Sequence, residues 1–209
     1  RLRTVTGVQT CALPISFLVY PIKLFVVFLH ELSHGIAAVV TGGKIVKVEI
    51  SYLIGGACYT SGGNQFIIAS AGYLGSISLG GVLLVQASRS KHTKLIGLIL
   101  ALIVIAVTLF YIRNSFGLIF GFSFGIALLL LSFFLPSVIL EWILKFIGIV
   151  SCFYVLIDIK EDLFTTEYRG SDTDALQALT GIPALAWAAL WILIAVIAFF
   201  YFIRKSLSK

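Results

Sequence analysis

Six long apolar segments constrain this chain more than any other feature of its sequence. Each is close to the roughly 20 residues that a helix needs to cross the hydrocarbon core of a bilayer. Because the bilayer interior offers no water to the backbone, spanning segments must pair their own polar groups, as helices do. The segments cover residues 17–40, 65–87, 94–112, 115–135, 137–158 and 183–204. We therefore expect an all-α polytopic membrane protein with about six transmembrane helices.

The composition supports a membrane setting. Hydrophobic residues make up 60% of the 209 residues and charged residues 11%, against about 45–50% and 25% in soluble domains. The net charge of +6 could suit a nucleic-acid partner, but the basic residues are scattered through short loops and the tail. We interpret them as topology signals and lipid-headgroup contacts, with the bilayer as partner and no nucleic acid.

The loops on the two sides of the membrane differ slightly in their number of basic residues. After the first span, one side carries Arg89, Lys91, Lys94, Arg204, Lys205 and Lys209, and the other carries Lys44, Lys47, Arg113, Lys160 and Arg169. Cytoplasmic loops are enriched in Lys and Arg. This count favours a cytoplasmic C-terminus, in the cell membrane if the source is bacterial.

The first 16 residues, RLRTVTGVQTCALPIS, differ from the rest of the chain. They have no initiator methionine, no amphipathic period and no signal-peptide layout, and they resemble a translated sequencing-adapter segment. We expect residues 1–16 to be non-native and residues 17–209 to form a single integral membrane domain.

Residues 41–64, between the first two spans, have a different pattern. β-Branched residues alternate with charged ones from 44 to 50, and glycine pairs stand at 42–43, 55–56 and 62–63. The pattern predicts a β-rich segment of one or two short strands at the membrane boundary, with an irregular interfacial loop as the alternative. If strands form, their open edge can receive an extended peptide by strand addition.

Residues 30–34 read HELSH inside the first span. On a helix, His30 and His34 lie one turn apart on the same face, so their imidazoles can bind one zinc ion. Glu31 can accept a proton from a water that the metal activates for attack on a carbonyl. The alternative is a chance pentapeptide whose histidines satisfy hydrogen bonds in a core. A charged group in a span costs at least about 2.5–3.5 kcal/mol at the centre, which favours a functional site.

A catalytic zinc normally has three protein ligands. The remaining histidine, His92, lies in a basic loop, so a carboxylate is the better candidate. Asp158 ends an apolar run, and Asp162 follows one helical turn later. We favour Asp158 because it is deeper, with Asp162 in reserve as a ligand or as support for a histidine N–H. The alternative is that both aspartates mark the helix end at the interface.

Two other segments have structural interpretations. Gly72, Ser76 and their neighbours in ASAGYLGSISLGG stand at small-x-x-x-small spacing, which predicts tight packing of helix 65–87 against the metal-bearing helix. Further on, Ser171 or Asp172 can cap a short helix that ends near Gly181. We interpret this second segment, SDTDALQALTGIP, as a lid or connector with solvated acidic residues.

Taken in order, these motifs resemble the site-2 protease family of intramembrane zinc metalloproteases. The likeness rests on HELSHGIAAVVTGGKIVKVEI, ASAGYLGS, YVLIDIKEDL and SDTDALQALTGIPALAW, and covers nearly all of residues 20–190. It implies His30 and His34 as zinc ligands, Glu31 as catalytic acid/base and an aspartate from a later span as the third ligand. The chain lacks the L-D-G motif and the asparagine-proline signature of other members, as in the compact branch of the family.

Two functions follow as hypotheses. The first is an intramembrane zinc metalloprotease that hydrolyses peptide bonds in or near transmembrane segments of membrane proteins. The second is a non-proteolytic zinc-binding membrane scaffold or a metal transporter that uses the same ligands without turnover.

Overall fold

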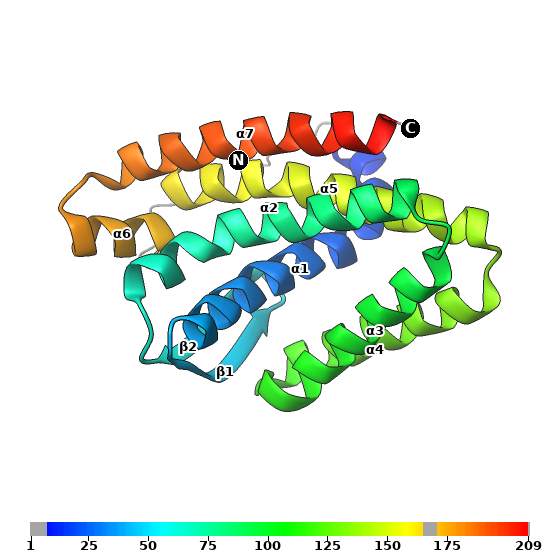
Figure 1. Ribbon diagram of the computed structural model, residues 1–209, viewed down its shortest axis with the longest axis horizontal. Helices are drawn as coiled ribbons and strands as arrows, with labels where there is room; N and C mark the ends of the chain where they lie inside the picture. The colour runs from blue at the N-terminus through cyan, green and yellow to red at the C-terminus, as the bar shows by residue number, and fades with distance from the viewer. Residues whose placement is uncertain (1–7, 165–170, 209) are drawn as a thin grey trace, which may run out of the picture.

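The computed structural model describes the backbone of residues 8–164 and 171–208, and the side chains of residues 19–160 and 171–208. The described residues form seven helices and one hairpin (Figure 1). The helices are α1 (Val8–Val40), α2 (Gln65–Arg89), α3 (Thr93–Tyr111), α4 (Ser115–Phe134), α5 (Ser137–Phe164), α6 (Asp172–Thr180) and α7 (Ala184–Leu207). Six of them, all but α6, are long and apolar enough to cross a membrane. The predicted multi-pass, six-span architecture is confirmed.

Helix α2 is central to the bundle. It packs against α1, α5 and α7, whereas α3 and α4 pair with each other in an arm that diverges below them (Figure 1). Small residues allow the close approach of α2 to its neighbours. A Cβ atom at Gly75 would collide with Ser33 of α1, and one at Gly80 would lie 2.6 Å from Cβ of Ser151 in α5. The predicted tight packing of α2 on α1, the helix that carries HELSH, is therefore confirmed.

Strands β1 (Lys44–Ser51) and β2 (Gly55–Ser61) form an antiparallel hairpin, as the β-branched and glycine-rich pattern predicts. Val48 is opposite Cys58, and a register shift occurs between Ile45 and Lys47. The turn includes Ile54 at φ 58°, a conformation that β-branched residues rarely adopt. The Ile54 side chain packs against the two larger clusters of buried apolar residues in the bundle. This packing holds the turn in place.

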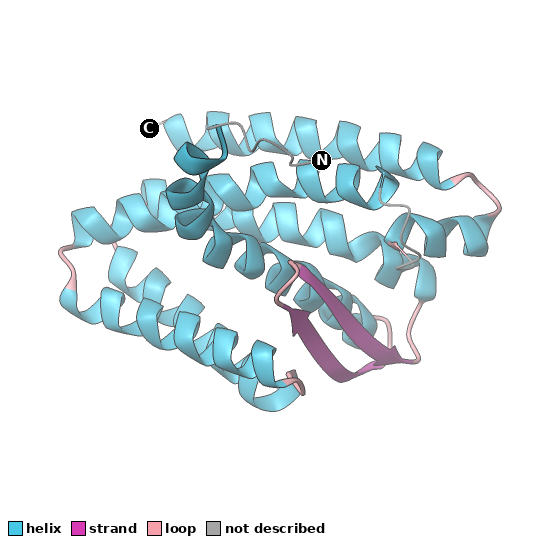
Figure 2. Cartoon of the chain, turned by 180° about the vertical axis from the view of Figure 1, so that it is seen from behind, coloured by secondary structure: helices cyan, strands magenta, loops and turns pink. Residues whose placement is uncertain are grey.

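The hairpin runs lengthwise along α1. Near one end, a Cβ atom at Gly35 would lie 2.6 Å from the Ile45 side chain. At the other end, the Tyr20 hydroxyl donates a hydrogen bond of 2.7 Å to the carbonyl of Tyr52. About 22 Å of helix separates Tyr20 from Gly35. The hairpin therefore extends along much of the first span (Figure 2).

The connection between α3 and α4 closes the outer edge of β1. The backbone N–H of Arg113 donates to the Val48 carbonyl at 3.1 Å. The Asn114 amide exchanges two hydrogen bonds with the backbone of Ile50, at 3.1 and 2.7 Å. Asn114 stands at the N-cap of α4 but makes no capping bond there, because its side chain binds the strand. Among the described residues, the outer edge of β2 has no strand partner.

We expect Asn114→Ala to lower the free energy of unfolding by about 2 kcal/mol. The substitution removes two hydrogen bonds and leaves the N–H and carbonyl of the buried Ile50 without these partners. Denaturant or thermal unfolding of the purified protein in detergent measures the loss. Ser115→Ala is the control, because this neighbouring serine is exposed. Equal stability of the two variants would contradict the proposed closure of the strand edge.

Candidate metal centre

Helix α1 presents His30 and His34 on one face, as the spacing of four residues predicts. Their ring centroids lie 4.7 Å apart, with the ring planes inclined by 74°. The side chains are 12% and 9% exposed. The two imidazoles thus lie side by side in a largely buried position within an apolar span.

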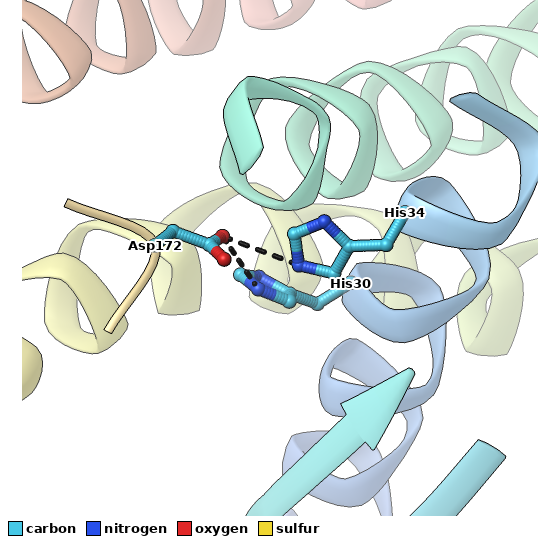
Figure 3. A group of neighbouring side chains, drawn as sticks. All are labelled: His30, His34 and Asp172. Atoms are coloured by element: carbon cyan, nitrogen blue, oxygen red, sulfur yellow. Dashed lines mark ion pairs between the residues drawn. The ribbon is translucent and has the colours of Figure 1, made fainter. Parts of the chain in front are cut away.

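Asp172, the first residue of α6, faces both imidazoles (Figure 3). Its Oδ2 atom lies 3.1 Å from Nε2 of His30 and 3.2 Å from Nε2 of His34. The start of α6 is fixed by a capping box, in which Ser171 and Asp174 exchange hydrogen bonds between side chain and backbone. These three converging side chains make up the candidate metal centre: His30, His34 and Asp172.

The structure places the aspartates differently from the expectation drawn from the sequence. The Asp158 carboxylate, favoured there as third ligand, lies 3.6 Å from Nδ1 of His30, the ring nitrogen opposite the one that faces Asp172. Asp162 belongs to α5, and its side chain lies outside the described residues. The interpretation of Asp172 as a solvated residue is wrong, because its side chain is only 17% exposed.

One signal in the sequence could have pointed to Asp172. A capping box needs only the N-cap residue and the third residue of the helix, here Ser171 and Asp174. Asp172 is therefore not needed for the capping box. Its position after the fifth span made it look remote from the first, and only the tertiary packing of α6 brings the two together.

A backbone carbonyl fixes which nitrogen of His34 carries the proton. Nδ1 of His34 lies 2.7 Å from the carbonyl oxygen of Ile68 in α2. A carbonyl can only accept a hydrogen bond, so Nδ1 is the donor. The lone pair of a neutral His34 is then on Nε2 and faces Asp172.

This arrangement can hold a cation between the three side chains. Oδ2 of Asp172 is buried and has no hydrogen-bond partner among the described residues. It faces Nε2 of His34, which is itself an acceptor, at 3.2 Å. The ligand atoms of a tetrahedral zinc site with bonds of about 2.0–2.1 Å lie about 3.3 Å apart. The residues present therefore fit a zinc ion.

The surroundings of Asp172 favour the ionised form of its carboxyl group. Burial acts to raise its pKa, but the nearby imidazoles of His34 and His30 outweigh burial and hold the pKa below its usual value. The group is therefore ionised at neutral pH, as a metal ligand must be.

Gly72 of α2 provides the room in which these atoms meet. A Cβ atom at this position would collide with Nε2 of His30 and lie 2.5 Å from Oδ2 of Asp172. The small residue thus has a second use besides helix packing. A side chain at Gly72 would fill the space between the candidate ligands.

Glu31 is buried next to the hairpin. Its side chain accepts a hydrogen bond from the backbone N–H of Cys58 in β2. A Cβ atom at Gly56 would lie 2.7 Å from Oε1 of Glu31, so glycine is needed where the strand crosses this carboxylate. The hairpin therefore fixes Glu31, while α2 and α6 surround the two histidines.

Comparison with known proteins identifies the family of this chain. The family model described as Peptidase M50B-like matches residues 5–202. No curated protein matches the chain, and no solved structure matches it. The matched region includes HELSH, the hairpin, the six candidate spans and Asp172. The chain therefore belongs to the Peptidase M50B-like family, and its resemblance to the site-2 proteases is confirmed.

Proposed function

We propose that the protein is an intramembrane zinc metalloprotease that hydrolyses peptide bonds in or near transmembrane segments of membrane proteins. Its zinc ligands are His30, His34 and, in place of Asp158, Asp172. The observation that carries the proposal is the approach of one buried carboxylate oxygen to two imidazole nitrogens, at 3.1 and 3.2 Å, beside an apolar span. Membership of the Peptidase M50B-like family supports the reaction class.

Glu31 is the acid/base of this proposal. When bound, zinc supplies Lewis-acid polarisation of the scissile carbonyl and lowers the pKa of the attacking water. Glu31 takes the proton of that water and gives it to the leaving amine. The Cys58 N–H holds the Glu31 carboxylate in place, and burial keeps bulk water from competing for it.

The edge of β2 that has no strand partner in the described part of the chain provides a place for the substrate backbone. The N–H of Cys58 points to Glu31, so this edge faces the acid/base. Unpaired backbone groups at membrane depth are costly unless they line a water-filled cavity or find a partner. An extended peptide that adds to β2 would satisfy them. The closed edge of β1 leaves β2 as the strand that receives it.

We expect Glu31→Gln to abolish cleavage while zinc is retained. The amide cannot accept the proton, which should reduce the cleavage rate by at least about 10²-fold, whereas the three ligands are unchanged. Cleavage of a membrane-protein reporter in lipid vesicles and metal analysis of the same sample give the two readouts. Glu49→Gln is the control, because Glu49 pairs with Lys47 near the surface. Unchanged cleavage by Glu31→Gln would favour a scaffold or transporter.

Replacement of Asp172 tests the ligand set. We expect Asp172→Asn to lose stoichiometric zinc, because a neutral amide is a poor zinc ligand. Asp174→Asn, two residues away in the same helical turn and exposed, should keep it, because the amide oxygen can still accept the capping bond from the Ser171 N–H. Metal analysis after purification measures both. Retention of zinc by Asp172→Asn would remove this residue from the ligand set.

The C-terminal end of α7 belongs in the cytoplasm, according to the count of basic loop residues. Arg204 and Lys205 stand in its last turn, where the positive-inside rule places them on the cytoplasmic side. A fluorescent protein fused after residue 209 in bacterial cells should fold and fluoresce. A phosphatase fused at the same point should be inactive, and the reverse pattern would contradict this orientation.

A further inference from the structure

The two histidines of the candidate metal centre differ at the ring nitrogen that faces away from Asp172. Nδ1 of His34 is satisfied by the Ile68 carbonyl at 2.7 Å. Nδ1 of His30 is buried and has no hydrogen-bond partner among the described residues. The Asp158 carboxylate lies 3.6 Å away from it. The Asp158 carboxylate is therefore close to Nδ1 of His30 but slightly too far away to accept a hydrogen bond from it.

A metal-binding imidazole needs such an acceptor. If Nε2 binds the ion, Nδ1 carries the proton, and its partner sets the tautomer and the ring orientation. A charge-assisted hydrogen bond between nitrogen and a carboxylate oxygen measures about 2.7–2.9 Å. A shift of about 0.8 Å, within the reach of a side-chain rotation, would close the gap between Asp158 and His30.

We propose that Asp158 is a positioning residue for the metal centre. Its carboxylate accepts the hydrogen bond of Nδ1–H of His30 and so directs the Nε2 lone pair toward Asp172. This inference rests on the zinc site proposed above, and it gives Asp158 an indirect role in place of direct coordination.

The proposed pair makes the two histidine ligands unequal. The acceptor for His34 is a neutral carbonyl, whereas the acceptor for His30 is a carboxylate. A carboxylate partner makes an imidazole the stronger donor to a metal. Loss of Asp158 should therefore change the electronic environment of the ion as well as its affinity.

Cobalt binding to the purified full-length protein tests this role. Co²⁺ replaces zinc and reports its ligand field through visible absorption. We expect Asp158→Asn and Asp158→Ala to bind one Co²⁺ about 10–100-fold more weakly than the unaltered protein, with a shifted spectrum. Asp158→Glu, which keeps the acceptor, should recover most of the affinity. Glu141→Gln is the matched control, because it removes a carboxylate of the same helix that pairs with Lys145.

Two results would overturn the proposal. Unchanged affinity and spectrum in Asp158→Ala would show that the carboxylate does not act on His30. Complete loss of binding in Asp158→Ala, with binding kept in Asp172→Asn, would make Asp158 a direct ligand. This test measures metal binding and does not depend on cleavage. A protein that binds cobalt as expected but cleaves no substrate would refute the proposed protease activity, and the proposed role of Asp158 would be unaffected.

A measurement on the unaltered protein covers the case in which the variants do not fold. Nitrogen-15 NMR of the zinc-loaded protein with labelled histidine should show a proton on Nδ1 of His30, shifted downfield by its carboxylate acceptor. A His30 ring that is protonated on Nε2 would refute the proposed arrangement.

Discussion

Three polar side chains that would each be costly in an apolar bundle meet at one point, and the surrounding helices are arranged around that meeting. The imidazoles of His30 and His34 and the carboxylate of Asp172 can share one cation, which would offset the cost of their burial, only while they stay together. α1 fixes two of them by helical spacing, and α6 contributes the third. Gly72 of α2 leaves the space in which they converge. A substitution in any of these elements therefore acts on the same site.

The cost of leaving polar groups without partners in an apolar bundle also explains how the hairpin is built. Backbone that is not helical can exist beside a membrane span only where its polar groups find partners. β1 obtains them from β2 on one side and from Arg113 and Asn114 on the other. On β2, the N–H of Cys58 is used by Glu31. Strand β2 and the acid/base are therefore in direct contact.

Local patterns in the sequence account for the spans, the strands and the HELSH face, because each depends on residues close together along the chain. The third carboxylate could not be chosen this way. Depth in a span favoured Asp158, but depth does not tell which ring nitrogen a carboxylate will face. Asn114 likewise has the sequence signature of a helix cap, yet its amide binds a strand more than 60 residues earlier. Such roles are set by how the elements pack.

The position of Asp172 also bears on how the fold is held together. About 140 residues of chain, with four spans and the hairpin, lie between His30 and Asp172. An ion held by both would act as a cross-link that closes this long loop, and it would favour the folded state in proportion to its affinity and concentration. Zinc availability would then set how firmly α6 is anchored to the bundle. The metal centre would then stabilise the fold in addition to any catalytic role.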